Sequence, residues 1–145
     1  MEQVVTNSLL NLEHAIQERG AHVTHGELPV VCGNSPQLIQ LLQNLVGNGI
    51  KYCDAKIPTI YVSATTHEGG IWLFSVSDNG IGIPKEYHRR IFEPFKRACN
   101  ESKYEGTGLG LATCRKTVER HHGSIWCDSK EGDGTTFFFT LPGAA

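Results

Sequence analysis

Three polar side chains follow one another along a helical stretch of the sequence. Asn44, Asn48 and Lys51 are four and then three residues apart, so on a helix they share one stripe, with Tyr52 at its edge. An amide oxygen is a hard ligand suited to Mg²⁺, and a lysine ammonium can meet a phosphate. The stripe could therefore hold a metal ion and phosphates, although a solvated helix face is the more common cause of such spacing.

Three glycine clusters accompany the stripe, at residues 78–82 (DNGIG), 106–110 (GTGLG) and 132–135 (GDGT). Glycine lets the backbone approach a ligand closely. A helix that opens with glycines presents free N–H groups and a positive dipole end to phosphate. Neither a Walker A loop nor a dinucleotide fingerprint is present. Taken alone, the second cluster is also typical of a flexible loop and the third of a hairpin turn.

Two helices are predicted in the first part of the chain. Apolar residues at helical spacing run over 4–19, and Gly20 is a plausible stop. For the second helix, Ser35 suits the N-cap and Pro36 the first helical position. Its leucine-rich face continues to about Tyr52 and lies beside the polar stripe.

The remaining elements are mostly strands joined by hairpins. A third helix is predicted from about Leu109 to His121, closed by Gly123. A short helix and loop are expected over 84–97, and a mobile loop over 98–107. Turn signals and apolar alternation predict six strands, at about residues 22–25, 30–32, 59–66, 71–77, 124–128 and 135–141.

This order of elements predicts one α+β domain over residues 1–145. Hairpins rather than crossovers favour a two-layer α/β sandwich, in which helices cover one face of a mixed, mostly antiparallel sheet. A chain of 145 residues is long enough for a single buried core.

Composition and charge exclude several classes of partner. A formal net charge of −2 gives no basic field for nucleic acid. The longest strongly apolar run, residues 71–74, is too short for membrane insertion. The five cysteines are odd in number and lack Cys-x-x-Cys spacing. They favour a cytoplasmic protein with reduced thiols over a disulfide framework or zinc site, and the chain start has no secretion signal.

The motifs together resemble those of the catalytic ATP-binding domain of sensor histidine kinases, which has the Bergerat fold. In family order they are the N box at 44–52 (NLVGNGIKY), the first glycine box at 78–84 (DNGIGIP), the F box at 91–97 (IFEPFKR), the second glycine box at 106–112 (GTGLGLA) and the last glycine box at 132–137 (GDGTTF). Residues 104–142 also resemble phytochrome-type and related sensor kinases.

The resemblance implies that the domain binds ATP with Mg²⁺. Asn48 is expected to ligate Mg²⁺, Asn44 to support the same region, and Lys51 to contact phosphate, which makes these three the catalytic set. Tyr52 is expected to pack near the adenine or ribose.

The resemblance also assigns residues to the adenine and to a lid over the nucleotide. Asp78 is expected to accept a hydrogen bond from the adenine amino group, beside Gly80, Ile81 and Gly82, with Thr135 supporting Asp78 or the base. Residues 96–107 are expected to form the lid, anchored by phenylalanines at 92 and 95. The nucleotide contacts implied in the lid and second glycine box are Arg97, Lys103, Gly106, Thr107, Gly108, Leu109 and Gly110.

Two residues of the N box stand out. The family usually has alanine where this chain has Gly49, which predicts a helix softer by about 1 kcal/mol rather than a lost site. ATP-hydrolysing relatives of the gyrase and mismatch-repair type have a glutamate at the position of Asn44 as general base. An amide cannot take that proton, so slow hydrolysis is expected.

The expected phosphate acceptor is therefore a histidine on a separate dimerisation domain, with a response regulator receiver domain downstream. None of the seven histidines of this chain lies in an acceptor-like helix. The chain is expected to be an isolated catalytic domain, whose residues 1–3 are a candidate stub of a connection. Its parent kinase could be soluble or membrane-anchored.

Two alternatives share the fold. A non-catalytic nucleotide-sensing module is disfavoured by the intact Asn48, Asp78 and glycine boxes. A serine kinase of the anti-sigma type is disfavoured by the F box.

Overall fold

The computed structural model describes residues 1–53, 57–93, 110–129 and 132–143. Its helices are α1 (Glu2–Asn11), α2 (Glu13–Arg19), α3 (Ser35–Lys51) and α4 (Gly110–Arg120). Its strands are β1 (His22–His25), β2 (Thr59–Thr66), β3 (Ile71–Asp78), β4 (Ile125–Ser129) and β5 (Thr135–Pro142). Three short 3₁₀ segments complete the set: η1 (Glu68–Gly70), η2 (Lys85–Tyr87) and η3 (Arg90–Phe92).

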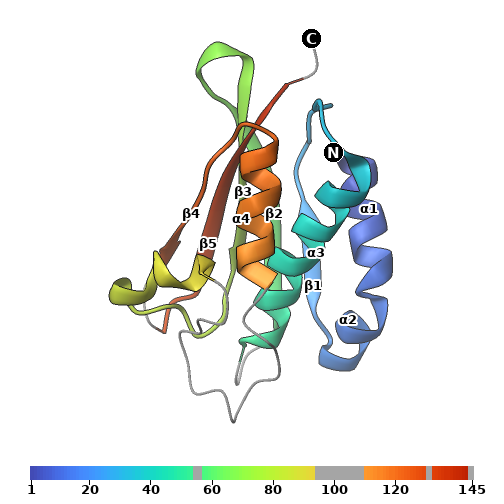
Figure 1. The fold of residues 1–145 in the computed structure, drawn as a ribbon. Helices are drawn as coiled ribbons and strands as arrows, with labels where there is room; N and C mark the ends of the chain where they lie inside the picture. The colour runs from blue at the N-terminus through green and yellow to red at the C-terminus, as the bar shows by residue number, and fades with distance from the viewer. Residues whose placement is uncertain (54–56, 94–109, 130–131, 144–145) are drawn as a thin grey trace.

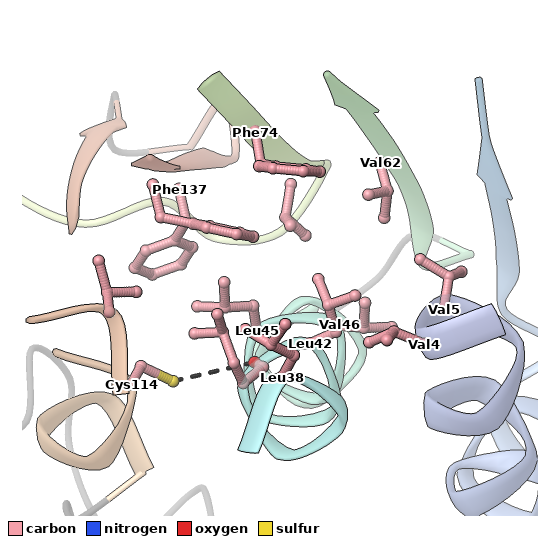
Figure 2. Packing of buried hydrophobic residues seen from close by; sticks show 14 of the residues in the cluster. Val4, Val5, Leu38, Leu42, Leu45, Val46, Val62, Phe74, Cys114 and Phe137 are labelled. Atoms are coloured by element: carbon pink, nitrogen blue, oxygen red, sulfur yellow. Dashed lines mark hydrogen bonds between the residues drawn. The ribbon is translucent and has the colours of Figure 1, made fainter. Parts of the chain in front are cut away.

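The strands form one sheet in the order β1-β2-β3-β5-β4 (Figure 1). β1 runs parallel to β2, and the other neighbours are antiparallel. Figure 2 shows the sheet on one side and helices α1, α3 and α4 together on the other. The predicted two-layer sandwich with a mixed, mostly antiparallel sheet is confirmed.

The core lies between the sheet and α3. The register places Val62 opposite Val76 and Val76 opposite Phe137, so apolar side chains of three strands form a row facing the helices. The rings of Phe74 and Phe139 stack with centroids 5.1 Å apart. The residues of α3 buried against this layer are Leu38, Leu41, Leu42, Leu45, Val46 and Ile50 (Figure 2). Full burial of each such side chain contributes roughly 1.5–3 kcal/mol, so this face fixes which way the polar stripe of α3 points.

The predicted first helix is two helices in the structure. The chain bends at Leu12 (φ −103, ψ 6), between α1 and α2. Leu9, Leu12 and Ile16 all pack against the core, so the bend keeps the apolar residues of both segments in contact with it. Gly20 ends α2, as predicted, and has the left-handed conformation (φ 63).

Two predicted helix boundaries were wrong. The N-cap of α3 is Asn34, whose side chain accepts from the Gln37 N–H at 3.0 Å, so Ser35 is already helical. The left-handed residue after α4 is His122 (φ 64), not Gly123. A Cβ atom at Gly123 would collide with a carbonyl oxygen of β5, so glycine is needed there for close packing.

Two other predicted elements differ from the structure. Residues 30–32 do not form a strand, since only Val31 makes an isolated bridge, to Gly143. Over 84–97 a short helix and a loop were expected, and the described residues 84–93 instead contain two 3₁₀ turns, η2 and η3. In these turns, i to i+3 bonds such as Glu93 N–H to Arg90 O close single turns. Among the described segments, no helix is long and apolar enough to cross a membrane.

Candidate nucleotide-binding site

Asp78 ends β3 with its two carboxylate oxygens in different surroundings. Oδ1 accepts the backbone N–H of Gly80 at 2.9 Å and that of Thr135 at 3.2 Å. Within the described segments, no donor reaches Oδ2. Burial raises the pKa of Asp78, and the two backbone hydrogen bonds oppose that rise. One oxygen is therefore fixed by the fold, and the other can accept a donor from a ligand.

The chain comes unusually close to itself around this carboxylate. A Cβ atom at Gly80 would lie 2.5 Å from the Tyr52 carbonyl oxygen, which accepts the Ile81 N–H at 2.9 Å. Gly134 has φ 89, and a Cβ atom there would collide with the carbonyl oxygen of Asp78. The first and last glycine clusters thus meet at Asp78, and each needs glycine for a steric reason.

Ser129 links these two clusters, a role that its position in the sequence did not suggest. Its hydroxyl accepts the Ile83 N–H at 2.7 Å and lies 2.9 Å from both the Gly134 carbonyl oxygen and the Thr135 hydroxyl. Thr135 itself is buried and contacts Asp78 through its backbone N–H. Gly82 (φ 77) directly precedes Ile83, whose N–H donates to the Ser129 hydroxyl.

Asn79 is a second residue that sequence reasoning missed. Its Oδ1 accepts the Thr59 N–H at 2.8 Å, and its Nδ2 donates to the Ile57 carbonyl oxygen at 2.9 Å. The side chain therefore fastens the loop after β3 to the start of β2. The only signal in the sequence was a turn motif, which does not show that the amide makes long-range bonds.

The polar stripe of α3 is half-buried. Asn44 points toward the start of α4, where its Nδ2 donates to the Gly110 carbonyl oxygen at 3.4 Å. Burial raises the pKa of the Cys114 thiol to about 12, and a hydrogen bond with the Asn44 side chain opposes that rise. Lys51 lies over the Tyr52 ring, with Nζ 5.1 Å from its centroid.

Asn48 differs from Asn44 in having no side-chain hydrogen-bond partner within the described part of the chain. It lies one turn further along α3, on the same stripe. The amide oxygen of Asn48 is therefore available to a hard cation such as Mg²⁺.

Gly49 has a packing role that the sequence did not reveal. A Cβ atom there would lie 2.9 Å from Cγ1 of Ile60 and 3.0 Å from Cβ of Asp78. The helix thus rests directly on the strand that carries the carboxylate. Glycine sets this spacing, whatever it costs in helix propensity.

Alanine at two neighbouring glycines of α3 should have opposite effects. At Gly47 the nearest atom to a new Cβ is Cδ2 of Leu12, at 3.7 Å, so Gly47→Ala should stabilise the fold by up to about 1 kcal/mol. Gly49→Ala should displace Ile60 and Asp78, destabilise the fold by roughly 1–3 kcal/mol and weaken ATP binding. Urea unfolding and calorimetry would measure both. Equal stabilisation by the two substitutions would contradict this packing role.

Several predicted contacts fall outside the described residues. They are Arg97, Lys103, Gly106, Thr107, Gly108 and Leu109, together with Phe95 and the rest of the predicted lid. Phe92 is buried and meets Phe137 edge-on, with ring centroids 6.1 Å apart. Of the described cysteines, Cys114 is buried, Cys127 is half-buried and Cys32 is exposed.

This chain spans only part of the length of the relatives that it matches. Residues 33–145 match the family model for histidine kinase-, DNA gyrase B-, and HSP90-like ATPases. Cyanobacterial phytochrome A of Nostoc sp. (strain PCC 7120 / SAG 25.82 / UTEX 2576) is 46% identical over 142 residues, which are 98% of this chain and 18% of the phytochrome. The adaptive-response sensory kinase SasA of Microcystis aeruginosa (strain NIES-843 / IAM M-2473) is 40% identical over 118 residues, which are 80% of this chain and 30% of that kinase.

Solved structures share the fold. The nucleotide-free catalytic domain of histidine kinase ThkA superposes with a TM-score of 0.80 at 27% identity, over 99% of this chain and 95% of that one. Full-length ShkA in complex with AMPPNP superposes with a TM-score of 0.83 at 27% identity, over 99% of this chain and 30% of that one. ThkA in complex with the response regulator protein TrrA superposes with a TM-score of 0.76 at 25% identity, over 99% of this chain and 40% of that one. The chain therefore belongs to the histidine kinase-, DNA gyrase B- and HSP90-like ATPase family, and its fold is that of sensor histidine kinase catalytic domains.

Proposed function

We propose that residues 1–145 form the ATP-binding catalytic domain of a two-component sensor histidine kinase. The observation that carries the proposal is the divided carboxylate of Asp78, with Oδ1 held by two backbone N–H groups and Oδ2 available to a ligand. Adenine presents an amino group to such an acceptor, whereas guanine presents a carbonyl oxygen at the same ring position. A carboxylate therefore selects adenine, in keeping with the AMPPNP bound by ShkA.

The residues of α3 would hold the phosphates. In this proposal the Asn48 amide oxygen ligates Mg²⁺, Lys51 contacts phosphate, and Tyr52 packs near the base or ribose. Magnesium usually takes few protein ligands and completes its shell with phosphates and water, which suits a single amide. When bound, the ion would neutralise charge on the phosphates. The remaining proposed contacts are Gly80, Ile81 and Gly82 near the base, Gly110 at the start of α4, and the second glycine box and lid residues named above.

The reaction would be phosphoryl transfer rather than hydrolysis. The bond between the γ-phosphorus and the β,γ-bridging oxygen breaks, ADP leaves with the electron pair, and a histidine nitrogen forms the new bond to phosphorus. The domain contributes position and charge rather than covalent chemistry. Asn44 supports this choice because an amide cannot activate water as a glutamate would, and here it contacts Gly110 and Cys114.

The acceptor histidine would lie on a separate dimerisation domain. Three histidines of the described segments have ring nitrogens at hydrogen-bond distance from the backbone. His121 uses both nitrogens, His88 places Nε2 2.9 Å from the Ile83 carbonyl oxygen, and His25 places Nδ1 2.8 Å from the Gly26 carbonyl oxygen. The downstream partner would be a response regulator receiver domain, by extension from the ThkA complex. We place the domain in the cytoplasm, where ATP is available and free thiols such as these stay reduced.

The test is incubation with γ-labelled ATP, alone and with a histidine-bearing dimerisation domain. The isolated chain should bind Mg²⁺–ATP but neither label itself nor release phosphate at a useful rate. Adding the second domain in trans should give acid-labile, base-stable phosphohistidine, weakly because the covalent tether that raises local concentration is missing.

Other outcomes would each point to a different function. Stoichiometric acid-labile label on the isolated chain would identify an acceptor among its own histidines. Rapid phosphate release would place the chain with the ATPases, and acid-stable label on a serine would favour a serine kinase. ATP binding without transfer, even to a tethered acceptor domain, would favour a nucleotide-sensing module.

A further inference from the structure

Helices α3 and α4 run antiparallel and are connected by hydrogen bonds at three positions along their length. At the nucleotide end, the Asn44 side chain donates to the Gly110 carbonyl oxygen. In the middle, the Cys114 thiol lies 3.9 Å from the Leu41 carbonyl oxygen, the dashed contact in Figure 2. The third tie, at the far end, is made by His121.

His121 joins the end of α4 to the first turn of α3. Its side chain is buried, with Nδ1 2.7 Å from the Thr117 carbonyl oxygen and Nε2 2.9 Å from the backbone nitrogen of Asn34. A carbonyl oxygen only accepts and a backbone N–H only donates. The ring must therefore be neutral, with the proton on Nδ1 and a lone pair on Nε2.

The surroundings of the ring are closely packed. A Cβ atom at Gly33 would lie 2.7 Å from Cδ2 of His121 and 3.0 Å from Cδ1 of Leu38. Asn34 is also the N-cap of α3, so the same residue caps the helix with its side chain and bonds to His121 with its N–H. The contact between His121 and Asn34 therefore fixes the end of α4 relative to the start of α3.

We infer that His121 is a positioning residue for the phosphate half of the nucleotide site. α4 is a short α-helix of 11 residues that packs as one unit, so a shift at His121 moves its other end, Gly110, by a similar amount along α3. Gly110 belongs to the second glycine box, and α3 carries Asn44 and Asn48. The inference rests on the proposed function, in which these elements hold the phosphates and Mg²⁺.

The adenine half of the site should not depend on this tie. Asp78 is held by Gly80 and Thr135, which belong to the loop after β3 and to β5. Loss of the His121 contact should therefore weaken binding of an ATP analogue but leave adenosine binding unchanged. A general loss of stability would weaken both ligands together, so the ratio of the two affinities separates positioning from folding.

The main variant is His121→Phe, which keeps a buried ring but leaves the Asn34 N–H without its partner. We expect affinity for Mg²⁺–AMPPNP to fall on the order of tenfold, with adenosine affinity unchanged. His121→Gln should retain most of the affinity, because its side-chain oxygen can accept the Asn34 N–H while the backbone N–H at position 121 keeps its 3.2 Å bond to Thr117 O. His122→Asn is the matched control, since it changes the neighbouring exposed imidazole.

Nitrogen-15 NMR of the wild-type imidazole tests the same tie without a mutation. The spectrum should show His121 with hydrogen on Nδ1 and none on Nε2, and the Asn34 amide should exchange slowly. Hydrogen on Nε2, or equal loss of both ligands in a folded His121→Phe, would overturn the inference alone. If wild-type protein bound neither AMPPNP nor adenosine, the proposed function itself would fail.

Discussion

Asp78→Asn should weaken ATP binding sharply while making the fold more stable. Oδ1 of Asp78 accepts two backbone N–H groups, from Gly80 and Thr135. An asparagine must place its carbonyl oxygen there, because its NH₂ group would face two donors. The NH₂ group then occupies the place of Oδ2 and meets the adenine amino group, donor against donor. A buried mismatch of this kind costs roughly 1–3 kcal/mol, a factor of about 5 to 150 in affinity.

The gain in stability has a separate cause. Burial raises the pKa of Asp78, so the folded protein keeps this proton at pH values where the unfolded chain, with a carboxyl pKa of about 3.9, has lost it. The contribution of Asp78 to the free energy of unfolding is therefore most favourable at low pH. It is lost as pH rises from the pKa of the unfolded chain to the raised pKa of the folded protein. An amide carries no such penalty, so the advantage of Asp78→Asn should grow across that window and then level off.

ATP binding should follow the opposite trend with pH. The ionised carboxylate is the acceptor for adenine, so wild-type affinity should rise as pH increases through the raised pKa. Urea unfolding and calorimetric titration over a pH series would measure both trends. Asp128→Asn, at an exposed carboxylate on β4, is the matched control and should change neither. Unchanged ATP affinity in Asp78→Asn would remove Asp78 from the adenine site.

The fold class and the main motifs could be predicted because they depend on local patterns. Alternating apolar residues marked β2 and β3, and the leucine spacing of α3 marked the helix that carries Asn44 and Asn48. Helix ends were less certain for a physical reason. Asn34 and Ser35 are both good N-cap residues, and only the path of the chain into α3 decides between them.

The contacts that shape the adenine site could not be predicted, because they join distant parts of the chain. Ser129 reaches Ile83, 46 residues away, and Thr135 reaches Asp78, 57 residues away. These pairs depend on the register of β5 against its neighbours β3 and β4, which no local pattern specifies. Gly49 shows the same limit: its sequence context indicated only low helix propensity, whereas its surroundings show close contact with the strand of Asp78.

Asn48→Ala should abolish the Mg²⁺ dependence of ATP binding without damaging the fold. The side chain lies on the polar stripe of α3, apart from the buried leucines, and in the described residues no hydrogen bond holds it. Alanine is also the better helix former, so the free energy of unfolding should stay the same or rise by a few tenths of a kcal/mol. Without the amide ligand, the ratio of ATP affinities measured with Mg²⁺ and with EDTA should fall to about 1.

The control for Asn48→Ala is Gln40→Ala, which removes an exposed amide from the same helix eight residues earlier and should leave the Mg²⁺ dependence intact. Asn44→Ala offers a second contrast, because that amide contacts Gly110 and Cys114 and its loss should loosen α4 as well. The two asparagines are thus separable: Asn44 should affect both stability and binding, and Asn48 only the metal-dependent part of binding. An Asn48→Ala protein that still binds ATP better with Mg²⁺ than with EDTA would show that the metal is held elsewhere.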